Sequence, residues 1–164
     1  MGDAASAMPR GKRLSITVDG ASSNPRRGRN GAGVVVELGG VVIAEISEET
    51  GMGTNNEAEY KAVIRGLEEA IRLHREGVPF DGVDVNSDSR LVVQHLTGTW
   101  AVQAVHLRAL YIRTEELVLH LGLLGKEVRF NNVIRTRSRS RRADMLAGVA
   151  IGRADSLQNA LSVP

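Results

Sequence analysis

The chain has 164 residues, of which 42% are hydrophobic and 24% are charged, a composition that supports one hydrophobic core. The absence of cysteine excludes disulfides, thiolate zinc sites and a cysteine nucleophile. Any bound metal must therefore have oxygen or imidazole ligands, and the four histidines show no paired ligand spacing. Oxygen ligands suit Mg²⁺ or Mn²⁺.

Basic residues are unevenly distributed along the chain, although its net charge is only +2. Between Lys126 and Arg142, Glu127 is the only acidic residue in a stretch that is rich in arginine. Positive patches of this kind favour a polyanionic partner such as a nucleic acid. A solvated loop is the alternative explanation for some of these arginines.

Alternating apolar residues predict a first strand over residues 14–20, which places Asp19 near its carboxyl end. Residues 20–31 are rich in glycine and arginine and are expected to form a loop. Two further strands, over residues 33–38 and 41–46, flank Gly39-Gly40, which is a strong hairpin signal. The three strands together predict an antiparallel meander.

Periodic apolar residues predict a long helix over residues 55–76, which Thr54 or Asn55 can cap. Glu57 in the first turn suits neutralisation of the helix dipole. Glu59, in contrast, begins the stripe of apolar residues that faces the core. An acid on the core side is unusual, so we consider Glu59 a candidate functional residue.

A short strand over residues 82–87 follows this helix, and such a strand–helix–strand order favours parallel pairing with the first strand. Asp88 then follows the carboxyl end of this strand, beside Asp19 on the neighbouring strand. Ligands of open α/β sheets bind outside these strand ends. Two further helices are expected over residues 91–96 and 103–121.

The C-terminal part predicts a last strand over residues 128–134 and a last helix over residues 141–155, with Asp144 on its inner face. Arginines alternate with serine and threonine between these elements. In an extended chain every second side chain projects to the same side. An extended segment would therefore align the guanidinium groups of Arg135, Arg137, Arg139 and Arg141.

Four segments resemble the motifs of the type 1 ribonuclease H family, in the family's order, and the resemblance extends from Leu14 to Ile151. It implies an α/β, ribonuclease H-like three-layer fold with helices on both faces of a mixed five-stranded sheet. The first three strands would form the antiparallel meander, and the others would pair in parallel. The implied activity is hydrolysis of the RNA strand of RNA–DNA hybrids. The segments are Asp19-Gly20, Thr54-Asn55-Asn56-Glu57-Ala58-Glu59-Tyr60, Ser87-Asp88-Ser89 and Ala143-Asp144-Met145-Leu146-Ala147.

The same resemblance implies that Asp19 bridges two divalent ions, Mg²⁺ or Mn²⁺. Asp144 would complete the site of the ion that activates the attacking water. Glu59 and Asp88 would hold the ion that stabilises the leaving oxygen, and the products would carry 5′-phosphate and 3′-hydroxyl ends. The physical chemistry agrees, because four packed carboxylates repel one another and two cations about 3.5–4 Å apart relieve that repulsion.

Thr54, Asn55 and Asn56 match the family segment that touches phosphate and the minor groove of the hybrid. Short amide side chains can donate to and accept from a 2′-hydroxyl, the group that distinguishes RNA from DNA. Asn24 matches another RNA-contacting asparagine of the family, although arginines replace glycines in its loop. These four residues are the candidate contacts to the RNA strand.

The sequence also departs from the family pattern. Ile134 stands where many members have a loop histidine, and Ser140 stands where they have an asparagine. The lysine-rich handle that grips the DNA strand in some members has no counterpart, because residues 98–111 contain only His106 and Arg108 as basic residues.

We hypothesise that Arg135, Arg137 and Arg139 replace this missing handle and bind the phosphates of the substrate. Trp100 lies near a family aromatic residue that approaches the DNA backbone. Burial of Trp100 in the core is an equally good interpretation of the sequence.

We expect residues 14–155 to form the ribonuclease H catalytic domain, residues 1–13 a disordered basic N-terminal tail and residues 156–164 a C-terminal tail. The first 13 residues lack the apolar run of a secretory signal, and no stretch approaches the ~20 apolar residues of a membrane span. The expectation is a cytoplasmic monomer that needs neither a membrane nor an obligate protein partner.

The main alternative is a catalytically weak or inactive ribonuclease H-like module that only binds RNA. Loss of one acid would favour it, and all four acids are present. A resolvase or transposase core is disfavoured by the Thr54-Asn55-Asn56 motif, and a phosphatase by the lack of a paired-aspartate context. Double-stranded RNA stays open as a second substrate beside RNA–DNA hybrid.

Overall fold

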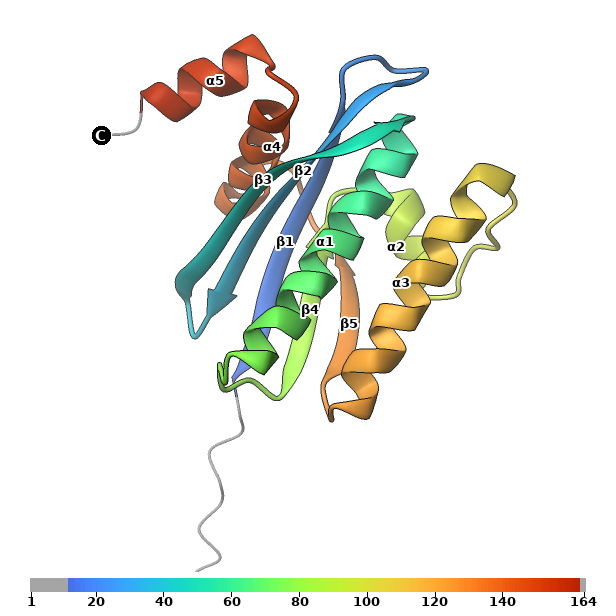
Figure 1. Cartoon of the computed structure of the whole chain (residues 1–164), viewed down its shortest axis with the longest axis vertical. Coiled ribbons are helices and arrows are strands. Elements are labelled where there is room, and N and C mark those ends of the chain that lie inside the picture. Colours follow the sequence, from blue (N-terminus) through green and yellow to red (C-terminus); the bar gives the residue numbers. More distant parts are fainter. Residues whose placement is uncertain (1–11, 163–164) are drawn as a thin grey trace, which may run out of the picture.

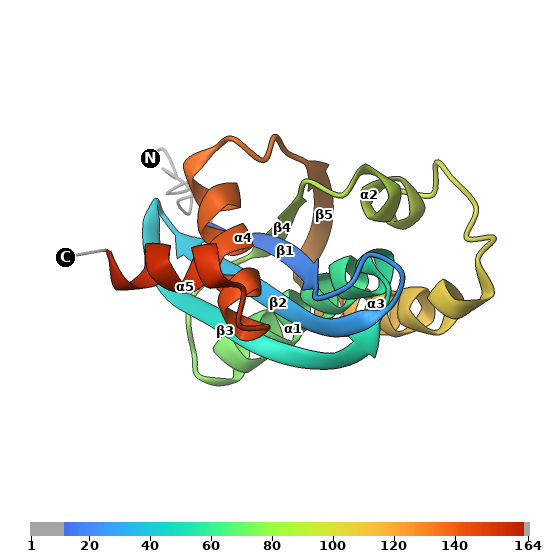
Figure 2. The same cartoon turned by 90° about the horizontal axis from the view of Figure 1, so that it is seen from above.

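The computed structural model describes residues 12–162, which form a five-stranded sheet with helices on both faces (Figure 1; Figure 2). Residues 1–11 of the predicted N-terminal tail and residues 163–164 lie outside this range. The strands are β1 (Arg13–Ser22), β2 (Gly28–Leu38), β3 (Val41–Gly53), β4 (Gly82–Ser87) and β5 (Glu127–Asn132). The helices are α1 (Asn55–Arg75), α2 (Arg90–Leu96), α3 (Val105–Leu123), α4 (Ser138–Ala150) and α5 (Ala154–Leu161).

The strand order in the sheet is β3-β2-β1-β4-β5. β2 pairs antiparallel with both β1 and β3, whereas β4 pairs parallel with β1 and with β5. Gly39 and Gly40 form the β2–β3 turn with φ of 59° and 80°, which side chains other than glycine rarely adopt. The predicted mixed sheet and its antiparallel meander are therefore confirmed.

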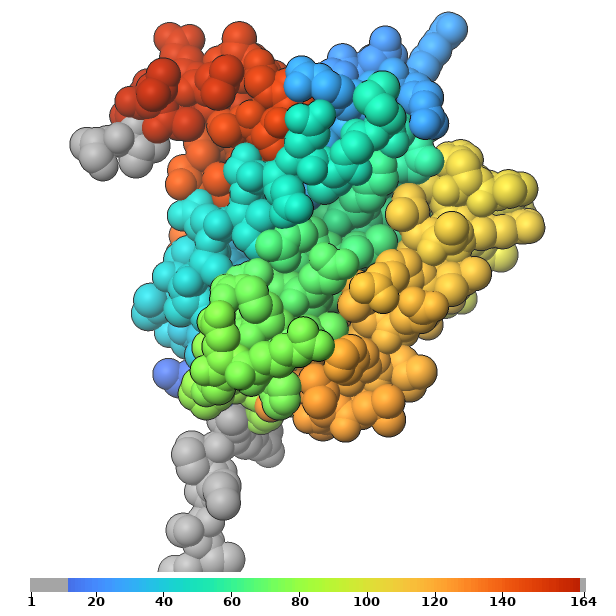
Figure 3. Space-filling model, in the orientation of Figure 1, coloured from blue at the N-terminus to red at the C-terminus, as the bar shows by residue number. Residues whose placement is uncertain are grey.

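Helices α1 and α3 cover one face of the sheet and lie side by side in the space-filling view (Figure 3). The inner side of α1 buries Val63 and Leu67 completely or nearly so, in the same cluster as Ile16 of β1. Helix α4 covers the opposite face, where Leu146 packs in a cluster with Val35 of β2. The sheet is thus fixed from both sides around β1 and β2.

A buried hydrogen bond of 2.7 Å joins Tyr60 Oη of α1 to His95 Nδ1 of α2. Burial lowers the pKa of His95 and raises the pKa of Tyr60, so both side chains are neutral near pH 7. This contact connects the start of α1 to α2 through the core.

The strands are longer than predicted, because β1 continues to Ser22, β2 already begins at Gly28, and β3 extends to Gly53. The prediction of a loop over residues 20–31 was therefore wrong. Its glycines allow helices to approach the sheet: a Cβ on Gly20 would lie 2.3 Å from the main-chain carbon of Ala58 in α1. Glycine served close packing here as well as turn formation.

The C-terminal part also differs from the prediction. The helix predicted over residues 141–155 is divided into α4 and α5, because Gly152 adopts a φ of 73° that reverses the chain. Residues 156–161, predicted as a tail, are helical in α5, and Ser156 is buried. Over residues 12–162, no helix combines the length and apolarity that crossing a membrane requires.

Candidate active site

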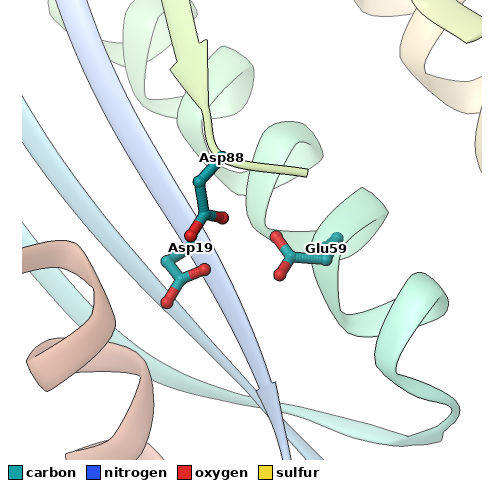
Figure 4. Close-up of side chains that lie close together, drawn as sticks. All are labelled: Asp19, Glu59 and Asp88. Atoms are coloured by element: carbon teal, nitrogen blue, oxygen red, sulfur yellow. The ribbon is translucent and has the colours of Figure 1, made fainter. Parts of the chain in front are cut away.

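Three carboxylates converge at the carboxyl ends of β1 and β4 (Figure 4). Asp19 lies on β1, Asp88 directly follows β4, and Glu59 projects towards them from α1. One oxygen atom from each carboxylate lies within 4.8 Å of the other two. Val18 and Ser87 are partners in the parallel β1–β4 register, which places the next residue of each strand, Asp19 and Asp88, side by side.

The N-terminus of α1 explains why Glu59 is available to this cluster. Thr54 caps the helix: its Oγ1 accepts from the Glu57 N–H at 3.2 Å, while Glu57 Oε2 accepts from the Thr54 N–H at 2.5 Å. Glu57 thereby satisfies the helix end, as predicted. Glu59 instead accepts from the Gly20 N–H at 3.2 Å, and this contact fixes its carboxylate against β1.

The electrostatics of the cluster favour a cation. Burial and the negative charges of Glu59, Asp88 and Asp144 raise the pKa of Asp19 to about 10. Burial and the charge of Asp88 raise the pKa of Glu59 to about 8. Among the described residues, neither oxygen of Asp19 has a hydrogen-bond partner, although both are buried. A hard divalent cation would satisfy these oxygens, so the residues present fit Mg²⁺ or Mn²⁺.

Asp144 lies outside this group of three but faces the same cavity. The cavity has a volume of about 490 Å³, and the side chain of Asp144 is 35% exposed in its wall. Asp144 Oδ1 accepts from Arg153 Nη2 at 3.1 Å. The cavity is lined by Gly20, Ala21, Ser22, Asn55, Asn56, Glu59, Asp88, Ser89, Arg135, Asp144 and Arg153.

The predicted row of aligned arginines is wrong, because Arg139 and Arg141 belong to α4 and Arg137 is its N-cap residue. Arg135 reaches the acids: its Nε lies 2.7 Å from Asp88 Oδ2, and its Nη2 lies 4.0 Å from Asp19 Oδ1. Arg139 instead pairs with Glu37 at 2.9 Å. Arg137 and Arg139 line a separate cavity of about 260 Å³, so the extended geometry that would align them is absent.

The predicted RNA contacts differ in their placement. Asn55 and Asn56 line the acid cavity, whereas the hydroxyl of Thr54 is engaged in capping α1. Asn24 lies in the β1–β2 turn, where its Oδ1 accepts from the Arg26 N–H at 2.9 Å.

Trp100 is 42% exposed, so the interpretation that it belongs to the core is wrong. The guanidinium group of Arg90 lies 5.5 Å from the centroid of its ring. Trp100 and Tyr111 line a further cavity of about 600 Å³ beside α3, away from the acids.

Arg153 was missed at the level of sequence, although it lines the acid cavity. A signal was present: Gly152 follows a helical pattern and can end it in a left-handed turn. The Arg153 N–H then donates to Gly148 O at 2.9 Å, which folds the arginine back along α4.

The sheet order and the acid cluster define a domain of the ribonuclease H-like class. A family model described as reverse transcriptase-like matches residues 17–150. The structure is similar to RNase H1 from Halobacterium salinarum, with 34% identity and a TM-score of 0.69, over 87% of this chain and 99% of that one. It is also similar to the N-terminal RNase H domain of Rv2228c from Mycobacterium tuberculosis, with 32% identity and a TM-score of 0.70, over 84% and 98% of the two chains. The chain therefore belongs to the type 1 ribonuclease H family.

A further neighbour is LC11-RNase H1, whose structure contains an RNA/DNA hybrid. It is 27% identical, with a TM-score of 0.71, over 92% of this chain and 100% of that one. Among curated sequences, ribonuclease HI of Halobacterium salinarum is 38% identical over 110 residues, which is 66% of this chain and 52% of the relative. The chain thus spans about half the length of this relative and 35% of the Mycobacterium tuberculosis protein Rv2228c.

Proposed function

We propose that this chain is a metal-dependent endonuclease that hydrolyses the RNA strand of RNA–DNA hybrids. The observation that carries this proposal is the convergence of Asp19, Glu59 and Asp88 at adjacent strand ends, with both oxygens of Asp19 buried and unpartnered among the described residues. Family membership and the hybrid bound to LC11-RNase H1 support the choice of substrate. All the acids come from one chain, which supports a monomer as the active unit.

Two divalent cations held by Asp19, Glu59, Asp88 and Asp144 would supply charge neutralisation and an activated water for phosphodiester hydrolysis. The chain itself contributes the orientation of these acids: Gly20 N–H fixes Glu59, and Arg153 fixes Asp144. Cleavage on this side of the phosphate would leave 5′-phosphate and 3′-hydroxyl ends.

The test is digestion of labelled RNA–DNA hybrid, double-stranded RNA, single-stranded RNA and DNA duplex with Mg²⁺ or Mn²⁺. We expect cleavage of the RNA strand of the hybrid, and its loss in Asp19→Asn and Asp88→Asn. Cleavage of double-stranded RNA would add the second substrate considered above. A wild-type protein that binds hybrid and cuts nothing in either metal would instead be the RNA-binding module.

Asn55 and Asn56 are the amide side chains in the wall of the acid cavity. We expect Asn55→Ala and Asn56→Ala each to lower kcat/KM for hybrid by about tenfold, since a lost hydrogen bond is worth about 1 kcal/mol. Steady-state kinetics on hybrid measures this loss. Asn131→Ala is the matched control because Asn131 bonds Asn86 on the sheet at 3.1 Å and lines no part of the cavity. Equal kinetics of all three variants would contradict a substrate role for the two asparagines.

Arg137 and Arg139 remain candidates for phosphate binding from their separate cavity. If they bind phosphates, changing both to Ala will raise KM and flatten its salt dependence by a slope of about one for each contact. KM measured between low and moderate salt concentration gives the slope. Arg129→Ala is the control, because Arg129 pairs with Glu127 at 3.1 Å on the far end of β5. An unchanged slope in the double variant would remove both arginines from the substrate interface.

A further inference from the structure

Arg153 contacts Asp144 through both its side chain and its main chain. Arg153 Nη2 lies 3.1 Å from Asp144 Oδ1 and 3.0 Å from Asp144 O. A single nitrogen thus holds the carboxylate relative to its own backbone. One carboxylate oxygen, Oδ2, is left without a bond to this arginine.

The guanidinium group of Arg153 is itself fixed in place. Its Nε donates to Ser156 Oγ at 3.0 Å, and Ser156 is buried in α5. It crosses α4 at Gly148, where a Cβ would lie 2.4 Å from Arg153 Nη2 and 2.0 Å from Ser156 Oγ. Gly152 reverses the chain with a φ of 73° and brings the arginine to this position. Helix α5 and two glycines therefore create the place that Arg153 occupies.

We infer that Arg153 is a positioning residue that orients Asp144 so that its free oxygen faces the cation held by the other acids. The inference rests on the proposed function for the role given to Asp144. Three observations support it: Asp144 and Arg153 line the same cavity as Glu59 and Asp88, the bond engages one carboxylate oxygen only, and Ser156 prevents the arginine from swinging away. The positive charge also offsets the repulsion among the acids.

Orientation has a clear physical value at this place. The Asp144 side chain is 35% exposed and without Arg153 would sample several rotamers. A ligand that must first be ordered binds a metal more weakly. Changes to residues that orient metal ligands typically cost 10- to 100-fold in metal affinity or activity.

The test compares Arg153→Gln with Arg142→Gln. Arg142 is the matched control because it also follows the start of α4, is likewise 36% exposed and pairs with one carboxylate, Glu45, at 2.5 Å on the outer side. Titration calorimetry with Mn²⁺ alone measures metal affinity without any need for turnover. We expect Arg153→Gln to weaken Mn²⁺ binding and to lower kcat by about 10- to 100-fold, with KM for hybrid unchanged. Arg142→Gln should match the wild type.

Two further variants separate positioning from a contribution to folding alone. Arg153→Lys should restore part of the Mn²⁺ affinity, because the ammonium group can still reach Asp144. Asp144→Asn combined with Arg153→Gln should bind Mn²⁺ as Asp144→Asn does, since Arg153 acts through this one carboxylate. Thermal unfolding of each variant reports any loss of stability separately.

Wild-type Mn²⁺ affinity in Arg153→Gln would overturn the inference, even if the melting temperature falls. Tighter Mn²⁺ binding in Arg153→Gln would also overturn it and would identify the arginine as a competitor of the metal. Failure of the proposed function is distinguishable, because a wild type that cuts no hybrid still yields the calorimetric comparison.

Discussion

Asp19→Asn is expected to raise the melting temperature of the metal-free protein at pH 8 while abolishing both its response to Mg²⁺ and its cleavage of hybrid. The pKa of Asp19 is raised from 3.8 to about 10 in the folded protein by burial and by the neighbouring acids. A raised carboxyl pKa destabilises the folded state once the pH exceeds the unfolded value, and increasingly so up to the folded value. The neutral amide removes this cost, which we put at about 1–3 kcal/mol for an unpaired buried group.

Thermal unfolding between pH 5 and pH 8, with and without Mg²⁺, measures these effects. The wild type should lose stability as the pH rises and regain it with Mg²⁺, by about 2.7 kcal/mol at a metal concentration of 100 Kd. Asp19→Asn should show neither response, and its cleavage rate should fall at least about 100-fold, since metal-ion catalysis supplies several kcal/mol.

Asp84→Asn is the matched control on the neighbouring strand. Asp84 pairs with Arg13 at 3.1 Å and is partly exposed, so its substitution should lower stability slightly and leave the Mg²⁺ response intact. An Asp19→Asn protein that is less stable than the wild type at pH 8, or that Mg²⁺ still stabilises, would contradict a cation site on Asp19.

Gly33→Ala is expected to cause the largest loss of stability among single-methyl additions. A Cβ at Gly33 would lie 1.9 Å from Ala143 O, a main-chain atom of α4 that cannot move without the helix. We expect a loss of about 3 kcal/mol, at the upper end for overpacking, and a fall in melting temperature of about 6–12 °C. The displaced residue precedes Asp144, so kcat should fall as well.

Gly122→Ala adds the same methyl group without a clash. A Cβ at Gly122 in α3 would meet no atom within 4 Å, and its backbone is helical. This variant should be more stable than the wild type by about 0.5 kcal/mol, because alanine favours a helix over glycine. Denaturation of the two variants in urea compares them, and similar midpoints would show that α4 does not pack on Gly33 as described.

The sheet topology could be predicted because each strand carried its own local signal. The Gly39-Gly40 turn announced the meander, and the strand–helix–strand order announced the parallel pair with β4. The acids Asp19 and Asp88 were found for the same reason, since strand ends in a parallel pair meet at one edge. Glu59 stood out as a charge on a buried stripe.

Glycine and arginine were the residues whose roles the sequence could not settle. Gly20 and Gly33 resemble turn residues in sequence, but their function is to let α1 and α4 approach, which depends on distant parts of the chain. The arginines suggested an extended row by alternation, yet α4 begins at Ser138 and sends Arg139 to Glu37. Arg153 reaches Asp144 only through a chain reversal, a tertiary feature that periodicity does not record.

The buried bond between Tyr60 and His95 has a consequence for the acids in front of it. Tyr60 follows Glu59 directly, and α2, which carries His95, begins shortly after Asp88. The bond is therefore a strut that sets the spacing of these two carboxylates from behind. Because burial keeps the imidazole uncharged, the strut holds through the neutral pH range, and the gap between the two acids is insulated from changes in acidity that alter the charges of the acids themselves.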